Sequence, residues 1–142
     1  MEITTKDAKD TQRLGQKIGS GLKGGEIIAL TGNLGTGKTT FVQGLAQGLG
    51  IKERVLSPTF ILMRQYQGEL DLYHLDMYRL DTNFYEEVRN LGLQEIWGKE
   101  KNVVVIEWAE KIKDHLPSGT IWIDFTQIGE ERLVKSDFSV KF

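Results

Sequence analysis

Apolar and polar residues alternate along this chain with two different spacings, which together predict an alternation of strands and helices. Apolar residues four positions apart are typical of a helix with one buried face, and Leu14, Ile18 and Leu22 show this spacing. Similar spacing predicts helices over residues 7–22, 38–49 and 84–98, the last with a break at Gly92, and a short helix that ends near Leu116. Short apolar or alternating runs predict strands over residues 2–5, 26–31, 60–66, 70–78, 103–106, 120–126 and 132–141.

Turn residues indicate how these strands pair. Gln67-Gly68 separates two predicted strands and Gly129 separates the last two, so each pair is predicted to form an antiparallel hairpin. Strands that alternate with helices are predicted to be parallel, because a helical crossover returns the chain to the same end of the sheet. The sequence therefore predicts one α/β domain over residues 1–142. Its mixed sheet is expected to have a parallel core and antiparallel edge strands.

Composition removes several classes of function. The chain has 142 residues, no cysteine and a net charge of −2. The lack of cysteine excludes disulfides, thiolate metal sites and cysteine nucleophiles. The net negative charge argues against a protein that binds nucleic acid by itself. The apolar runs are far shorter than the roughly 20 residues of a membrane-spanning helix, and the polar N-terminus has no secretory signal. These features predict a cytoplasmic protein with no membrane partner.

The stretch GNLGTGKT, residues 32–39, matches the phosphate-loop pattern G-x-x-x-x-G-K-[ST] at every required position. It lies between a predicted strand and a predicted helix, where glycines let backbone N–H groups point at one anion and the helix adds its positive N-terminus. The predicted nucleotide-binding residues are Gly32, Asn33, Leu34, Gly35, Thr36, Gly37, Lys38, Thr39 and Thr40. Lys38 is expected on the β- and γ-phosphates, Thr39 on Mg²⁺ and Thr40 on the α-phosphate. This setting predicts the three-layer sandwich of P-loop NTPases.

The absence of a guanine-specific motif indicates which base the bound nucleotide carries. Small GTPases select guanine with N-K-x-D after the phosphate loop, and no such string occurs here. The nearest match, residues 5–7, comes before the loop and lacks the spacing. ATP is therefore the favoured nucleotide.

Two carboxylates follow predicted strands at positions suited to hydrolysis. Glu107 comes directly after the apolar run at residues 103–106, as in a Walker B strand, where it is expected to hold Mg²⁺ or orient the attacking water. His74 and Asp76 are two apart, so on a strand they share a face. That face turns from apolar to ionisable, as expected of a strand that enters a site. A hydrogen-bonded structural role for His74 is an equally good interpretation.

The stretch VLSPTF, residues 55–60, is the third element with candidate chemistry. Pro58 favours extended geometry at Ser57, and Ser57 and Thr59 offer hydroxyl groups shortly after the phosphate-loop helix. In switch NTPases a threonine in this region senses the γ-phosphate through Mg²⁺. An ordinary proline-containing loop fits the same spacing.

Four motifs in order, GNLGTGKTTF, SPTF, YHLDMYRL and VIEWAE, span residues 32–110. In this combination the chain resembles the TsaE family, also called YjeE, of small bacterial P-loop ATPases. It departs from the family at Asn33, where an acidic residue is frequent, and at Thr36, where alanine is frequent. The resemblance implies a role in making N6-threonylcarbamoyladenosine in tRNAs that read codons beginning with A. It also implies that the ATPase binds two other proteins, TsaB and TsaD, and that its ATP hydrolysis supports their repeated turnover, with tRNA held by these partners.

The resemblance also implies roles for individual residues. Lys38 and the loop bind the phosphates, and Thr39 and Glu107 hold Mg²⁺. Asp76 lies near the γ-phosphate and is essential, and Ser57-Pro58-Thr59 forms the switch loop. Trp108 packs beside the nucleotide. The catalytic residues expected on this basis are Lys38, Thr59, Asp76 and Glu107.

Two other functions fit a phosphate loop followed by a strand and a carboxylate. A small-molecule kinase needs a lid with arginines over the transferred phosphate, and the six arginines of this chain are scattered along it. A nucleotide-gated binding module with negligible hydrolysis has the same sequence pattern as a slow ATPase. ATPase measurements with and without TsaB and TsaD separate this module from the ATPase, and a screen for ATP-dependent phosphorylation of a small acceptor tests for the kinase.

Overall fold

The computed structural model describes residues 1–33, 37–55, 63–78 and 92–137. Within these ranges, seven strands form one sheet in the order β1-β7-β6-β2-β5-β4-β3. The strands are β1 (Glu2–Thr5), β2 (Ile27–Thr31), β3 (Met63–Tyr66), β4 (Asp71–Asp76), β5 (Asn102–Glu107), β6 (Ile121–Ile128) and β7 (Glu131–Ser136). The helices are α1 (Ala8–Ser20), α2 (Lys38–Gly48), α4 (Leu93–Ile96) and the 3-10 helix η1 (Ala109–His115).

The sheet is mixed, as the sequence predicts. Strands β6, β2, β5 and β4 are parallel neighbours in its centre. At one edge β6, β7 and β1 pair in antiparallel fashion, and at the other β3 pairs with β4. Both hairpin predictions are therefore confirmed. The central strands β2 and β5 are buried along nearly their whole length, which explains why they are continuous apolar runs rather than alternating ones.

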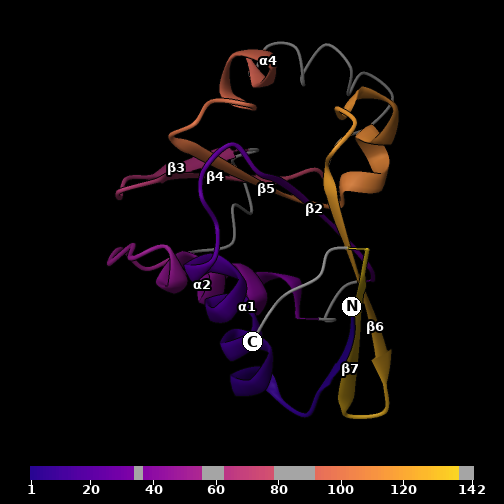
Figure 1. The fold of residues 1–142 in the computed structure, drawn as a ribbon. Coiled ribbons are helices and arrows are strands. Elements are labelled where there is room, and N and C mark those ends of the chain that lie inside the picture. Colours follow the sequence, from indigo (N-terminus) through magenta and orange to yellow (C-terminus); the bar gives the residue numbers. More distant parts are fainter. Residues whose placement is uncertain (34–36, 56–62, 79–91, 138–142) are drawn as a thin grey trace.

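Helices lie on both faces of the sheet, which gives three layers (Figure 1). Helices α1 and α2 cover one face, and α4 and η1 lie over the other. Successive strand residues point to opposite faces, so each central strand contributes to two cores. On β2, Ile28 and Leu30 join the core under α1 and α2, whereas Ile27 and Ala29 join the core under η1 and α4. The predicted three-layer α/β sandwich is confirmed.

Close packing of α1 against α2 fixes where α2 begins. A Cβ atom at Gly15 of α1 would lie 2.2 Å from the Phe41 carbonyl oxygen, and one at Gly44 of α2 would lie 2.0 Å from the Gln12 carbonyl oxygen. Both distances are far below van der Waals contact, so only glycine allows the two backbones to come this close. The first turn of α2 is thereby held at the carboxyl end of β2.

Several element boundaries differ from the sequence prediction. The segment after β5 is the 3-10 helix η1, and Ile112 within it has non-helical dihedral angles (φ −122°, ψ 24°) that mark a kink. Helix α4 begins after Gly92, which adopts a left-handed conformation, and ends where Trp97 becomes extended. The rest of the helix expected up to residue 91, and of the strands expected over residues 60–62 and 138–141, lies outside the described residues.

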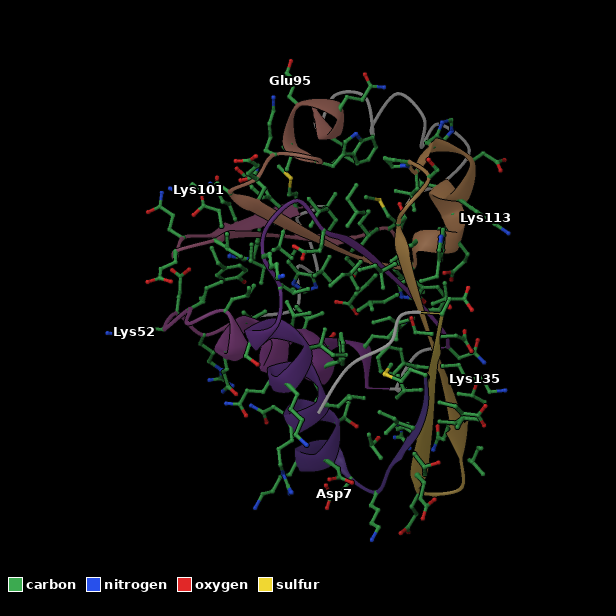
Figure 2. The ribbon with its side chains drawn as sticks, viewed as in Figure 1. Asp7, Lys52, Glu95, Lys101, Lys113 and Lys135 are labelled. Carbon is green, nitrogen blue, oxygen red and sulfur yellow. The ribbon has the colours of Figure 1, made fainter. Side chains whose placement is uncertain are left out.

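Charged side chains lie around the outside of the molecule. Figure 2 shows the labelled charged side chains of Asp7, Lys52, Glu95, Lys101 and Lys113 pointing away from the layers. Among the described residues, no helix is both long and apolar enough to cross a membrane. A buried charge needs a specific explanation. In the described part of the chain, the buried ionisable side chains are Lys38, His74 and Glu107, near the carboxyl end of β5.

Candidate functional site

The connection from β2 to α2 has the backbone geometry that the phosphate-loop pattern predicts at its two ends. Gly32, directly after β2, has φ +131°, and Gly37, directly before α2, has φ +92°. These positive angles are readily available only to glycine. The Gly37 carbonyl accepts from Phe41 N at 2.9 Å as α2 begins. The N–H groups of the first turn of α2 therefore face the carboxyl edge of the sheet, where they favour an anion.

Ionisable residues of β4 and β5 lie on the sheet face that α2 covers. Leu72 and Val105 belong to the core under α1 and α2, and His74, Asp76 and Glu107 continue their two-residue spacing along the same face. In the parallel register Asp76 is the partner of Glu107. Two carboxylates on adjacent strands are thus brought together beside the N-terminus of α2.

Glu107 is the centre of this group, and it is buried with only 3% of its surface exposed. Thr39 Oγ1 donates to its carboxylate, at 3.2 Å from Oε1 and 3.4 Å from Oε2. His74 Nε2 lies 2.6 Å from Oε2. The backbone carbonyl of Glu107 accepts from Met77 N at 3.0 Å, which ties the end of β5 to the residue after β4. The carboxylate therefore has a fixed position between α2 and β4.

Lys38 is buried as well, with 4% of its surface exposed. Its Nζ donates to the Gly32 carbonyl oxygen at 2.5 Å and lies 3.6 Å from the centroid of the Trp108 ring. Burial lowers the pKa of Lys38, and the nearby Glu107 carboxylate is the largest influence in the opposite direction. A partly desolvated ammonium group at a helix N-terminus attracts an anion strongly, since little water has to be removed from it.

Trp108 brings its ring over Lys38 by means of an unusual backbone conformation. Its φ of +57° makes it the one non-glycine residue with a positive φ in the described part of the chain. This conformation is costly for a bulky residue and is maintained only where the surroundings determine it. The ring also lies 5.1 Å from that of Tyr78. The sequence did not reveal the contact with Lys38, because nothing local indicates a left-handed tryptophan.

Asp76 is half-buried at the end of β4, and its Oδ1 accepts from Tyr78 N at 2.9 Å. Burial raises the pKa of Asp76, and the Glu107 carboxylate raises it further, against the lowering effect of the Tyr78 hydrogen bond. A carboxylate with a raised pKa is a stronger base than an exposed one. Asp76 is thus suited to orient a water molecule or accept its proton.

The structure thus brings together Lys38, Thr39, Asp76 and Glu107 from α2, β4 and β5. Thr40 is half-buried on the first turn of α2, and Asn33 is exposed after Gly32. The predicted residues Leu34, Gly35, Thr36 and Thr59 lie outside the described residues, as do Ser57 and Pro58. Sequence reasoning placed His74 on the correct face but did not identify its partner, since that required the pairing of β4 with β5.

The oxygen atoms at this site fit Mg²⁺. The Thr39 hydroxyl group and the Glu107 carboxylate are hard oxygen ligands that already touch each other. No group of three or more histidine, cysteine, aspartate and glutamate side chains suited to hold a metal occurs in the described part of the chain. Mg²⁺ typically takes one or two protein oxygens and completes its shell with phosphate and water, so this small donor set suits it.

Comparisons with known proteins point to one family. A family model described as "Threonylcarbamoyl adenosine biosynthesis protein TsaE" matches residues 5–134. The chain is 42% identical to the tRNA threonylcarbamoyladenosine biosynthesis protein TsaE of Treponema pallidum over 131 residues, 92% of this chain and 94% of that protein. It is 37% identical to the Bacillus subtilis protein of the same name over 128 residues, 89% of this chain and 78% of that protein. The crystal structure of Bacillus subtilis YdiB is similar with a TM-score of 0.80 and 31% identity, covering 96% of this chain and 83% of that one.

Proposed function

Because the chain belongs to the TsaE family of tRNA threonylcarbamoyladenosine biosynthesis proteins, we propose that it is an ATPase that binds ATP and Mg²⁺ beside α2. Membership implies a nucleotide-binding P-loop fold. The observation that carries the proposal is the meeting of Lys38, Thr39, Asp76 and Glu107 at the carboxyl end of β2, β4 and β5. Ligands of open α/β sheets bind at this end.

In this proposal the loop and Lys38 hold the phosphates. The phosphate-loop pattern assigns the backbone N–H groups of the loop and the N-terminus of α2 to the β-phosphate. The Lys38 ammonium group exchanges the neutral Gly32 carbonyl and the Trp108 ring for phosphate oxygens, which are stronger, charged acceptors. Thr40 donates to the α-phosphate. These contacts bind and orient the substrate and do not by themselves break a bond.

Thr39 and Glu107 would hold Mg²⁺, since their oxygen atoms are adjacent. When bound, Mg²⁺ neutralises negative charge on the phosphates as the terminal phosphate departs. Asp76 orients the attacking water and accepts its proton, a role that its raised pKa supports. Thr59, which precedes β3 in the sequence and lies outside the described residues, is proposed as the sensor of the γ-phosphate.

The purpose proposed for hydrolysis is to reset a tRNA-modifying complex. We assign residues 1–142 to a single ATPase domain that binds the TsaB and TsaD proteins in the cytoplasm, while tRNA contacts those partners. The net charge of −2 supports this division, because a protein that bound tRNA alone would need a basic surface.

A reconstituted assay tests the proposal. ATP hydrolysis and threonylcarbamoyladenosine formation are measured over several turnovers with TsaB, TsaD, tRNA and the wild-type chain, Lys38→Ala or Glu107→Ala. We expect both variants to remain folded by circular dichroism and to lose hydrolysis and repeated modification. Full modification with both variants would contradict the proposed roles. Phosphorylation of a small acceptor would indicate a kinase instead, and modification without hydrolysis would indicate a nucleotide-gated binding module.

A further inference from the structure

The buried histidine of β4 has no role in the function as proposed so far. We propose that His74 is a positioning residue that holds the Glu107 carboxylate against Thr39 and away from Lys38, so that the carboxylate and the ammonium group are both available to the Mg²⁺–nucleotide complex. This inference rests on the proposed function, since it concerns the availability of two groups assigned to ligands. It adds to that function a residue that touches neither nucleotide nor metal.

The contact between His74 and Glu107 is short and shielded from water. Nε2 of the ring and Oε2 of the carboxylate are 2.6 Å apart, and the side chains are 0% and 4% exposed. A carboxylate only accepts hydrogen bonds, so Nε2–H donates. Charge-assisted hydrogen bonds of this kind are the strong ones, and this one fixes the direction of the Glu107 side chain.

Among the described residues, Glu107 is the hydrogen-bond partner of the His74 ring. Leu72, two residues earlier on the same face, and Val105, its register partner on β5, are both buried and apolar. The register partner of His74 on β3 is Arg64, whose Nε is buried without a hydrogen-bond partner among the described residues and therefore does not bond to the ring. In the part of the chain that the structure describes, Nδ1 is buried without a hydrogen-bond partner. Burying an imidazole in such a place is unfavourable unless its polar atoms are satisfied. The contact with Glu107 offsets this cost at Nε2, and the same contact holds the Glu107 carboxylate in place.

The position of Lys38 shows what this contact prevents. An ammonium group and a carboxylate this deeply buried attract each other strongly. The salt bridges within 4.0 Å in the described residues nevertheless do not include Lys38 with Glu107. Lys38 donates instead to the Gly32 carbonyl oxygen, and Glu107 accepts from His74 and Thr39. Without His74, we expect Glu107 to turn toward Lys38, which would occupy both groups.

Two conservative substitutions distinguish positioning from simple packing. The side-chain amide nitrogen of His74→Gln reproduces the position of Nε2, whereas that of His74→Asn reproduces the position of Nδ1 and does not reach Glu107. Binding of a non-hydrolysable ATP analogue to the full chain is measured by calorimetry over a series of Mg²⁺ concentrations and in EDTA. We expect His74→Asn to raise the half-saturating Mg²⁺ concentration about tenfold, the usual effect of losing a partner that orients a metal ligand. His74→Gln should keep the half-saturating Mg²⁺ concentration within about threefold of wild type, because it retains a hydrogen-bond donor at the position of Nε2.

Two controls complete the experiment. In a Glu107→Gln background, His74→Asn should change analogue binding by less than about twofold, because a residue that acts through Glu107 has no effect once that carboxylate is gone. Leu75→Val removes a methylene group from the other face of β4 and reports the effect of lower stability alone. It should leave the Mg²⁺ requirement unchanged.

The outcomes separate the inference from the proposed function. An unchanged Mg²⁺ requirement in His74→Asn, or an equal loss in both backgrounds, overturns the role of His74 and leaves the ATPase proposal standing. If the wild-type chain binds no nucleotide, the proposed function fails. Thermal unfolding without ligand then decides whether His74 and Glu107 are coupled, in a cycle of wild type, His74→Asn, Glu107→Gln and the double variant. Additive shifts in Tm overturn the inference, and non-additive shifts support the contact.

Discussion

Two threonine–carboxylate pairs lie at the same end of the sheet, and only one of them belongs to the candidate site. Thr39 donates to Glu107 at 3.2 Å, and Thr31 donates to Asp124 at 2.6 Å. Judged by hydrogen-bond length alone, the second pair would be the stronger candidate for a functional site. That pair is exposed and borders an open depression lined also by Trp122 and Lys135, whereas Glu107 is 3% exposed.

The difference arises from the alternation of side chains along β2. Leu30 is the register partner of both Glu107 and Ile123 and faces α1 and α2, so Thr31 and its partner Asp124 face the opposite side. Among the described residues, the N-terminus of α2 and the second carboxylate, Asp76, lie on the first face, and Glu107 acts on the pKa of Lys38 more strongly than Asp124 does. The same two functional groups therefore form a site on one face and an ordinary surface hydrogen bond on the other.

Neutralising the two carboxylates should give the largest contrast. Glu107→Gln keeps the side-chain shape but loses the charge that we propose holds the metal, so we expect partner-stimulated ATP hydrolysis to fall roughly 100-fold or more. Asp124→Asn should retain hydrolysis within about twofold, as surface substitutions usually do. Steady-state phosphate release measures both. Equal losses would show that the exposed pair belongs to the site and would remove the contrast.

The two lysines that face these pairs should differ in nucleotide affinity. Lys38→Met keeps much of the side-chain volume and removes the ammonium group, and we expect ATP to bind about 100-fold more weakly because a charge-assisted contact is lost. Lys135→Met, beside Asp124 in the register of β6 and β7, should bind ATP as the wild type does. Calorimetric titration gives both affinities.

A smaller effect is expected for the hydroxyl groups themselves. Thr39→Val should raise the Mg²⁺ concentration needed for tight ATP binding by about tenfold, since the oxygen proposed as a metal ligand is replaced by a methyl group. Binding in EDTA should be nearly unchanged. Thr31→Val should show neither effect. If Thr39→Val weakened binding equally in EDTA and in Mg²⁺, the hydroxyl group would serve the phosphates rather than the metal.

The smallest effect concerns stability at Asp76. Because burial raises the pKa of Asp76, the folded protein binds this proton more tightly than the unfolded chain. The charged form therefore costs stability above the raised pKa, and the cost disappears as the pH falls toward the ordinary value of 3.8. Asp76→Asn keeps an acceptor for Tyr78 N and should raise Tm at pH 7 by about 2 °C. The advantage should shrink as the pH is lowered toward 4.

Asp71, at the other end of β4, is the matched control for this stability effect. Its carboxylate lies 3.9 Å from Nζ of Lys101, whose side chain is 68% exposed, and ion pairs with a solvated partner contribute little. Its Oδ1 also accepts from Gly68 N, and the amide oxygen of an asparagine can accept the same hydrogen bond. Asp71→Asn should leave Tm within about 1 °C of wild type at pH 7. A destabilised Asp76→Asn at pH 7 would show that the Asp76 charge is compensated in the folded state.

Local features of the fold were predictable because their causes are local. Gly32 and Gly37 needed positive φ angles, and the apolar run at residues 103–106 could only be a buried strand or a short buried helix segment. The four-residue spacing from Leu14 defined α1 for the same reason. By contrast, Ile112 interrupts a helix that the pattern favours, and no property of the neighbouring residues announces this.

The contacts of the site were predictable only in part. His74 and Glu107 are 33 residues apart in the chain, and Thr39 and Glu107 are 68 apart. Their meeting depends on β5 lying between β2 and β4, an order that residue spacing does not determine. The left-handed Trp108 over Lys38 is a further consequence of that packing.

By itself, the sequence determined the chemistry: a loop that can hold phosphates, a lysine, a threonine and carboxylates at the ends of strands. It did so because glycine angles, apolar spacing and functional groups are properties of single residues and their near neighbours. Only the tertiary structure decided which threonine meets a buried carboxylate, and that the His74 ring contacts that carboxylate. Burial depends on which layers cover each face of the sheet, and the energy of a charge depends on that burial.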